Sequence, residues 1–576
     1  MNIIGISAFY HNSAVSLFID GELIGAIEEE RISRKKFDAS FPELSLNSLL
    51  SENNLTPNDI DLVCYYEIPK EKLRRQFLMV EKIEDIPFNK LFNQYYNPEK
   101  SMKTYFGDNV KIEYFKHHMS HMAFSFYASG FQESSFLIAD AVGELDSLAY
   151  GHINCFGKLD YHSIKFPHSI GMLYSTFTQY LGYRINSDEY KVMGLAAYGE
   201  PRYLDKLEVL VETMELDDFK LNLEYFEFGN YFHKQTYSKK LEKLITVKPL
   251  ADKTEITQCH KDLAASIQAL IEKIILSFVI KIKEKYPNSR TLCLGGGVAL
   301  NSVCNMKISQ SNIFEDIYIP CSPGDAGSAI GCAYLGIINN KQKINSIFQP
   351  YLGREIKNNK KNYEMFGSIG EVGLDKIATL LHQGNIIGVV NGKSEFGPRA
   401  LGNRSILASP SIKGMKNKIN LKVKIREGYR PFAPVILEEE ASKYFVNIKT
   451  NHYMTQTYSV KDISLDVLPE SVHIDKTARA QTVSAKSNPW LYSLISKFYA
   501  LSNCPALINT SFNLSDEPIV DTDLDAIMCF LRSDIDYLYI DGILLDKTKV
   551  SRNIIKNAKE FYKTDNVISE NQSYSF

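Results

Sequence analysis

The chain has 576 residues, of which 44% are hydrophobic and 23% are charged, and its formal net charge at pH 7 is -3. This length exceeds one ordinary hydrophobic core and predicts a globular protein of at least two domains. The near balance of 65 Lys and Arg against 68 Asp and Glu argues against a nucleic-acid partner and against strong attraction to a membrane surface. The cysteines are scattered without a Cys-x-x-Cys motif, which favours reduced thiols in a cytoplasmic protein over disulfides or a thiolate zinc site.

Two segments bear on membranes. The first residues, Met1–Gly5, contain no basic residue before their apolar ones, so we expect no signal peptide. The longest apolar helical stretch, Leu270–Ile282, is interrupted by Glu272 and Lys273, and we expect it to be too short to span a bilayer. The sequence therefore predicts no association with a membrane.

Strand patterns occur twice in the N-terminal half. Residues 3–8, 13–19 and 22–27 form one apolar series with a hairpin turn at Asp20-Gly21. Residues 135–139, 148–153 and 159–166 repeat the series, and helical periodicity follows each one. The repetition predicts an N-terminal duplicated α/β architecture of the actin and sugar-kinase type, in which a nucleotide binds between two halves.

A later strand, 291–294, runs into a glycine turn and then a helix. Gly295, Gly296 and Gly297, followed by Asn301, are candidates for nucleotide binding, because glycines let backbone N–H groups approach a phosphate or ribose. Tight packing is the alternative explanation for such a turn. Polar stretches at 339–343 and 357–361 place a domain boundary near residue 350, and the polar tail after about Ile555 is expected to be poorly ordered.

Two histidines form the start of a candidate metal site. His117 and His121 lie four residues apart, so on a helix they share a face and can bind one ion. A zinc peptidase would have Glu directly after the first histidine, where this chain has His118. The alternative is a polar helix face without metal. Asp325, next to two glycines, is the candidate third ligand, and Asp140 is the candidate fourth. This set suits iron(II), zinc or manganese.

The most unusual segment comprises residues 394–407, where Arg399, Asn403 and Arg404 lie among glycines and a proline. Arginine forks match phosphate or carboxylate groups, and glycines allow close approach of an anion to the backbone. Further donors follow in the sequence: Lys424, Arg426, Arg430, Arg479, Asn509 and Ser511. Together they predict a cationic pocket for a small, highly charged ligand, and the alternative is a loop of solvated arginines.

These segments resemble the NodU/CmcH family of O-carbamoyltransferases over nearly the whole chain. The resemblance is carried by residues 5–14, 28–36, 117–121, 189–196, 295–297, 394–407, 509–518 and the segment around Arg479. Two positions depart from the family pattern: Asn12 and Ala141 stand where the family usually has Asp and Gly. Both departures would lie near the acceptor, so they concern the identity of the acceptor more than the adenylation chemistry.

The resemblance implies an ASKHA-type, Kae1-like domain over residues 1–350, which binds metal and nucleotide, and a YrdC-like α/β domain over 351–576. It implies that ATP and carbamoyl phosphate yield carbamoyl-adenylate, whose carbamoyl group then passes to a hydroxyl of a sugar or other natural product. Magnesium would accompany ATP. The second domain would bind carbamoyl phosphate and nucleotide through Arg399, Lys424, Arg430, Arg479, Asn509 and Ser511, and the first would hold iron(II) through His117, His121, Asp140 and Asp325.

The resemblance also implies a transfer site at His11 and Lys36. His11 would act as the base for the acceptor hydroxyl, because an imidazole titrates near neutral pH. Lys36 would stabilise the charge that develops on the carbamoyl oxygen. The alternative for His11 is a turn histidine with a purely structural partner.

Two other functions are compatible with parts of the sequence. tRNA threonylcarbamoylation uses related folds, but usually as separate proteins, and this chain has no basic stripe. An actin-like ATPase without group transfer would account for the strand series and glycine turns, but it leaves the histidine pair and the arginine-rich half unexplained. We therefore expect carbamoyl phosphate, ATP and a small hydroxyl acceptor as partners, a cytoplasmic location, and sheet edges that would permit a homodimer.

Overall fold

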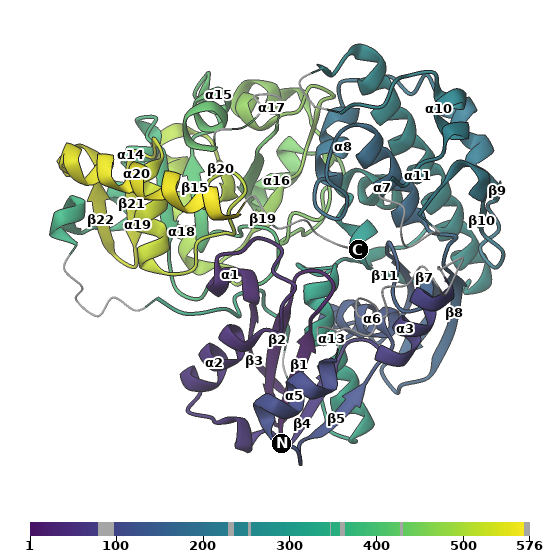
Figure 1. Cartoon of the computed structure of the whole chain (residues 1–576). Helices are drawn as coiled ribbons and strands as arrows, with labels where there is room; N and C mark the ends of the chain where they lie inside the picture. Colours follow the sequence, from purple (N-terminus) through teal and green to yellow (C-terminus); the bar gives the residue numbers. More distant parts are fainter. Residues whose placement is uncertain are drawn as a thin grey trace. The chain divides into compact units, whose positions relative to one another are not determined.

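The computed structural model describes residues 1–78, 97–228, 235–251, 255–345, 347–356, 363–424, 426 and 430–569. The chain divides into two compact units (Figure 1): the first contains residues 1–29 and 37–348, and the second contains residues 30–36 and 349–576. The predicted boundary near residue 350 lies beside this junction. The placement of residues 30–36 in the second unit is not predicted by the sequence, and the polar stretch 357–361 lies outside the described residues.

The described residues of the first unit form two five-stranded sheets with the same strand order. The first sheet runs β3 (Glu22–Glu28), β2 (Ala14–Ile19), β1 (Asn2–Ser7), β4 (Leu62–Tyr65) and β5 (Lys111–Tyr114). The second runs β8 (Leu159–Lys165), β7 (Asp146–Asn154), β6 (Glu133–Ala139), β11 (Thr291–Gly295) and β12 (Asp316–Tyr318). In each sheet the first three strands are antiparallel and the last two join in parallel. This repeated order confirms the predicted duplicated α/β architecture.

The other elements of the first unit are mostly helical. They are α2 (Glu43–Glu52), α3 (Pro69–Leu78), α5 (Pro98–Phe106), α6 (His117–Ser129), α7 (Ile170–Tyr180), α8 (Glu189–Ala196), α9 (Leu204–Leu207), α10 (Lys239–Ile245), α11 (Gln258–Lys285), α12 (Ser302–Gln310) and α13 (Asp325–Asn339), with a small hairpin of β9 (Val211–Thr213) and β10 (Lys220–Leu221).

Helices α6 and α13 lie side by side (Figure 1), and each follows the last strand of one sheet. Helix α13 packs on β1, β2 and β4 of the first sheet, whereas α6 packs on β6 and β11 of the second. Glycines permit this approach: a Cβ on Gly331 of α13 would lie 1.8 Å from the carbonyl oxygen of Ser120 in α6. A Cβ on Gly5 of β1 would lie 1.9 Å from the carbonyl oxygen of Ala329. The helix pair is therefore held at close range between the two sheets.

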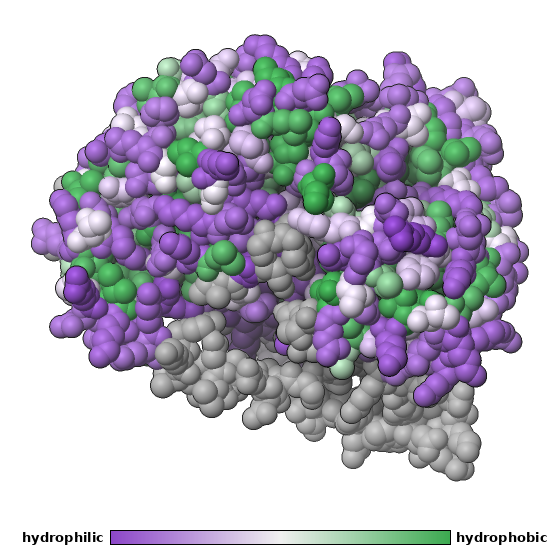
Figure 2. All heavy atoms as spheres, turned by 90° about the horizontal axis from the view of Figure 1, so that it is seen from above, coloured by the Kyte–Doolittle hydropathy of each residue, from purple (hydrophilic) through white to green (hydrophobic). Residues whose placement is uncertain are grey.

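Helix α11 corrects one expectation about membranes. It has 28 residues and is long and apolar enough to span a bilayer by length and composition. The predicted stretch was too short because the buried apolar positions of the helix begin at Leu263, ahead of Leu270. Of its most apolar window, 67% is buried, and Leu270, Ile274 and Phe278 belong to the core. On the face in Figure 2, hydrophilic residues predominate. Helix α11 is thus a largely buried core helix of its unit.

The second unit contains an eight-stranded mixed sheet among its described residues. Its order is β13 (Ser368–Glu371), β22 (Ile543–Asp546), β21 (Tyr537–Ile540), β14 (Ile387–Val390), β15 (Arg404–Ala408), β20 (Ala506–Ser511), β16 (Ala433–Leu437) and β19 (Gln481–Val483). Alternate residues face opposite sides. Ile387 and Val389 pack with α14 (Leu374–His382) and α18 (Pro489–Ser502). Val390 packs on the other side with α19 (Asp523–Arg532). The predicted C-terminal α/β domain is confirmed.

The remaining elements of the second unit lie around this sheet. They are α1 (Glu29–Ser33, of which Glu29 belongs to the first unit), α15 (Met415–Lys418), the π-helix Ile419–Lys424, α16 (Glu438–Tyr444), α17 (Asp462–Val467), α20 (Arg552–Ser569) and a small pair of β17 (Tyr458–Ser459) and β18 (Thr477–Ala478). The poorly ordered tail predicted after Ile555 is instead the helix α20 as far as Ser569, because Ile554, Ile555 and Ala558 share an apolar face that packs on the core. Residues 570–576 lie outside the described residues.

Candidate metal centre and anion site

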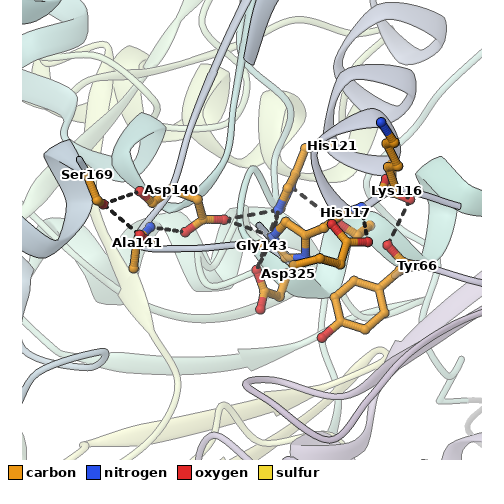
Figure 3. A network of polar contacts seen from close by, with 12 residues as sticks. Tyr66, Lys116, His117, His121, Asp140, Ala141, Gly143, Ser169 and Asp325 are labelled. Atoms are coloured by element: carbon orange, nitrogen blue, oxygen red, sulfur yellow. Dashed lines mark hydrogen bonds and ion pairs between the residues drawn. The ribbon is translucent and has the colours of Figure 1, made fainter. Parts of the chain in front are cut away.

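Four side chains of the first unit converge on one point (Figure 3): His117 and His121 from α6, Asp140 after β6, and Asp325 at the start of α13. Their ligand atoms all lie within 4.8 Å of one another. Nε2 of His121 lies 3.0 Å from Nε2 of His117 and 3.1 Å from Oδ2 of Asp140. Nε2 of His121 lies 3.5 Å from Oδ1 of Asp325. The structure therefore brings the four predicted ligands together, at separations that suit ligands of one ion.

Hydrogen bonds orient these ligands. Oγ of Ser328 lies 3.1 Å from Nδ1 of His121, which leaves Nε2 directed at the cluster. The backbone N–H of His117 donates to Oε1 of Glu144 at 2.9 Å. Neither Ser328 nor Glu144 was predicted from the sequence. Ser328 stands three residues after Asp325, one helical turn away, and this spacing is a signal that could have identified it.

The protonation states of the cluster suit a cation. Burial alone would lower the pKa of His117, but the carboxylates of Asp325 and Asp140 outweigh it and raise the pKa to about 9. Burial opposes ionisation of Asp140, but hydrogen bonds from His117 and His121 hold its pKa well below its usual value. Oδ2 of Asp325 is buried and has no hydrogen-bond partner among the described residues. A divalent cation could replace the protons on the imidazoles and satisfy this oxygen.

The predicted glycine turn lies next to the cluster. Gly296 has φ of 81°, which favours glycine, and a Cβ there would lie 2.2 Å from the carbonyl oxygen of Ala139. A Cβ on Gly297 would lie 3.0 Å from Oδ1 of Asp140. The turn therefore presents main chain, without side chains, beside one of the four ligands. This arrangement suits the approach of a phosphate to backbone N–H groups.

Two other predicted residues of the first unit have structural partners. Oδ1 of Asn301 caps α12, and its amide exchanges hydrogen bonds with Gln268 at 2.9 and 3.1 Å. Nε2 of His11 hydrogen-bonds the carbonyl oxygen of Asn186 at 2.5 Å, and its ring stacks on Phe37 with centroids 5.2 Å apart. Lys36 belongs to the second unit, so the two residues predicted for the transfer site come from different units.

In the second unit, cationic side chains from several segments converge. Nζ of Lys424 donates to Oδ1 of Asn513 at 2.6 Å and to Oγ of Ser511 at 3.2 Å. Burial lowers the pKa of Lys424 well below its usual value, and the positive charges of Arg426 and Arg430 add to the effect. Burial also lowers the pKa of Arg479, with contributions from Arg399, Arg426 and Arg430. Positive charges that act on one another in this way favour an anionic ligand.

Arg404 and Asn403 hold the backbone of the predicted arginine-rich loop. The guanidinium of Arg404 is fully buried and donates to the backbone carbonyls of Asp521, Asn391, Gly392, Asn403 and Arg354. Nδ2 of Asn403 donates to the carbonyl oxygen of Lys393 at 2.8 Å. These donors contact main-chain carbonyl groups, which gives both residues a structural role, and their predicted ligand binding stays a prediction.

A buried carboxylate that the sequence analysis missed shapes the same loop. Oε1 of Glu395 accepts the backbone N–H groups of Leu401, Asn403 and Arg404 at 2.7, 2.8 and 3.1 Å. Nδ2 of Asn509 donates to the carbonyl oxygen of Ala400 at 3.1 Å. The loop therefore folds around one carboxylate, and Asn509 acts on its backbone. An acidic residue buried at the base of a glycine- and arginine-rich loop is the signal that was overlooked.

Comparison with known proteins gives a consistent result along the chain. Residues 2–334 match the family model described as carbamoyltransferase N-terminus, and residues 378–547 match the one described as carbamoyltransferase C-terminus. Nodulation protein NolNO of Sinorhizobium fredii is 34% identical over 571 residues, covering 95% of this chain and 80% of that protein. Nodulation protein U of Rhizobium tropici is 26% identical over 576 residues, covering 96% and 97%. A crystal structure of full-length HypF, in a phosphate- and nucleotide-bound form, aligns with a TM-score of 0.33 at 11% identity, over 60% of this chain and 56% of HypF.

The match to the carbamoyltransferase N-terminus model alone spans more than half of the residues. The chain therefore belongs to the carbamoyltransferase family and is a carbamoyltransferase.

Proposed function

We propose that this carbamoyltransferase forms carbamoyl-adenylate in its second, YrdC-like unit and transfers the carbamoyl group to a hydroxyl of a small molecule in its first, Kae1-like unit. The observation that carries the proposal is the convergence of Arg399, Lys424, Arg430 and Arg479 in the second unit. A nucleic acid is a poor substrate for a chain with net charge -3. We infer a cytoplasmic enzyme whose acceptor is a sugar or another natural product.

The second unit supplies charge and orientation. Carbamoyl phosphate is a dianion, and a site with several guanidinium groups would neutralise it and hold it against ATP. Carbamoyl phosphate, ATP and water yield carbamoyl-adenylate, pyrophosphate and phosphate when a carbamate oxygen attacks the α-phosphorus and pyrophosphate leaves. Each hydrogen bond to such a charged group contributes about 1.5–3 kcal/mol, so the loss of Arg479 should reduce adenylate formation roughly tenfold to hundredfold.

The first unit has residues suited to the transfer step. An iron(II) or similar divalent ion held by His117, His121, Asp140 and Asp325 would supply Lewis-acid chemistry. The glycine turn beside Asp140 would bind the phosphate of the adenylate through backbone N–H groups. Because a carbonyl oxygen faces Nε2 of His11, that nitrogen carries the proton. Nδ1 is then the nitrogen that can accept the proton of the acceptor hydroxyl.

The first test uses no acceptor. Purified protein is incubated with ATP and carbamoyl phosphate, and carbamoyl-adenylate and pyrophosphate are sought by mass spectrometry. We expect both products only when carbamoyl phosphate is present. ATP that stays intact, or is only hydrolysed to ADP, even with hydroxyl acceptors added, would refute the adenylate route.

Variants separate the two units. Arg479→Ala should form carbamoyl-adenylate about tenfold to hundredfold more slowly, whereas Arg290→Ala, at an exposed surface ion pair with Glu315, is a matched control that should form it at the wild-type rate. His117→Ala should lose bound metal by elemental analysis while it still forms carbamoyl-adenylate. Unchanged metal content in His117→Ala would remove the assignment of the metal centre.

A further inference from the structure

Residues 30–36 belong to the second unit although they lie between two stretches of the first. Helix α1 spans this change. Its first residue, Glu29, acts in the first unit, where its carboxylate accepts the backbone N–H groups of Leu44 and Ser45 at 3.1 and 2.8 Å. From Glu30 onward the chain contributes to the second unit, and it returns at Phe37. Contacts within the second unit must explain why these seven residues belong to it.

Arg34 holds the loop that follows β20. Its Nη1 donates to the carbonyl oxygen of Ile519 at 2.7 Å and its Nη2 to that of Pro518 at 2.9 Å. Its Nε lies 3.6 Å from Oδ1 of Asp525. Two adjacent carbonyls are thus held by one planar fork, which fixes their direction as well as their distance.

Arg31 holds a second loop. It is buried, and its Nη2 donates to the carbonyl oxygen of Gly397 at 2.6 Å. Gly397 has φ of 106°, a conformation that a residue with a side chain rarely adopts. Arg399 follows two residues later. The hydrogen bond from Arg31 to Gly397 therefore restrains the position of the backbone that leads to Arg399.

The two loops are those that build the cationic site. The β20 loop is closed by hydrogen bonds from Val520 N to Phe512 O at 2.8 Å and from Asn513 Nδ2 to Glu517 O at 2.7 Å. Asn513 is also the residue that holds the ammonium group of Lys424. The restraint that Arg34 places on Pro518 and Ile519 is therefore transmitted through a short, closed loop to Lys424.

Lys36 lies within electrostatic range of Lys424. Burial is the main reason for the lowered pKa of Lys424, and the charge of Lys36 is among the positive charges that contribute. Lys36 is half-buried, whereas its neighbour Lys35 is exposed. The turn after α1 thus directs the two lysines into different surroundings.

We propose that residues 30–36 are a built-in part of the anion site of the second unit, in which Arg31 and Arg34 position the two ligand loops and Lys36 supplies a further positive charge for a phosphate group. The inference rests on the proposed function, in which that phosphate belongs to carbamoyl phosphate or ATP. It moves Lys36 from the acceptor site to the adenylation site, and it makes a segment encoded within the first unit necessary for the chemistry of the second.

The lysine pair provides a matched test in the full-length protein. Binding of inorganic phosphate and of carbamoyl phosphate is measured by calorimetry for the wild type, Lys36→Met and Lys35→Met. Loss of one charged contact should weaken binding of both ligands about tenfold in Lys36→Met, whereas Lys35→Met should bind as the wild type does. Equal binding by Lys36→Met and the wild type would overturn the inference. Because phosphate binding is scored without turnover, a wild type that binds phosphate but forms no carbamoyl-adenylate contradicts the proposed function and not this inference.

The positioning role of Arg34 is tested by comparing the changes in KM and kcat of its variants. Arg34→Gln should raise KM for carbamoyl phosphate about tenfold or more, with a smaller change in kcat and unchanged metal content, and Arg34→Lys should fall between Arg34→Gln and the wild type. A merely structural link would lower the unfolding temperature and leave KM unchanged, and that result would contradict the positioning role. If Arg34→Gln does not fold, the Lys36→Met binding measurement decides.

Discussion

Replacing Gly331 by alanine tests whether the contact between α6 and α13 sets the metal centre. The new Cβ would lie 1.8 Å from the carbonyl oxygen of Ser120, far inside the 3.0 Å that real Cβ atoms keep. The two helices must therefore separate by roughly 1 Å, at a cost of about 1–3 kcal/mol for overpacking. Asp325 is on one helix and the histidines are on the other, so the movement adds directly to the 3.5 Å between His121 Nε2 and Asp325 Oδ1.

Metal–ligand distances tolerate changes of only about 0.2 Å, so we expect Gly331→Ala to bind metal at least about tenfold more weakly than the wild type. The assay is metal titration with elemental analysis, together with thermal unfolding. Gly194→Ala in α8 is the matched control, because a Cβ there would meet nothing within 4 Å. It should stabilise the protein by roughly 0.5–1 kcal/mol with unchanged metal content. Wild-type metal affinity and melting in Gly331→Ala would refute the reasoning.

Three further predictions address the other parts of the molecule. Ser328→Ala removes the partner of His121 Nδ1 and should lower metal affinity about 10- to 100-fold, measured by competition with a chromophoric chelator; unchanged affinity would show that Ser328 does not orient the ring. Arg404→Met removes a buried guanidinium that donates to five backbone carbonyls and should destabilise the protein by at least about 3 kcal/mol in denaturant unfolding; a smaller loss would contradict its structural role. Removal of the bound metal with a chelator, followed by assay with magnesium restored, should stop carbamoyl transfer but leave carbamoyl-adenylate formation, because the ligands belong to the first unit; loss of both activities would contradict this separation.

The features predicted well are those encoded by local pattern. The two strand series were visible because alternation and turn residues act within a few positions, and the His117 and His121 pair was visible because a helix repeats every 3.6 residues. Asp140 and Asp325 were identified because each stands at the end of an apolar run or between glycines. In the structure all four lie within 4.8 Å of one another.

The features that were missed depend on contacts between distant segments. Glu395 was overlooked because its partners are backbone N–H groups, which its position at the start of a glycine- and arginine-rich segment indicates only weakly. Glu144 meets the backbone of His117 across 27 positions of the chain. The membership of residues 30–36 in the second unit depends on carbonyl groups such as that of Ile519, 485 positions away from Arg34. Propensity and periodicity carry no information about such partners.

The duplication explains why the metal centre forms where it does. Helices α6 and α13 occupy equivalent places, each after the fifth strand of its sheet, and each carries a ligand at its first residue, His117 or Asp325. The positive end of a helix dipole favours a carboxylate over a carboxylic acid and a neutral imidazole over an imidazolium. Both helix ends therefore favour the forms that bind metal, and they offset part of the proton affinity that Asp325 and Asp140 confer on His117. Each of the two sheets, with the helix that follows it, supplies one helix N-terminus that carries a ligand. Packing the two helices together through Gly331 joins both ends with Asp140, so the two halves jointly form a site that neither contains.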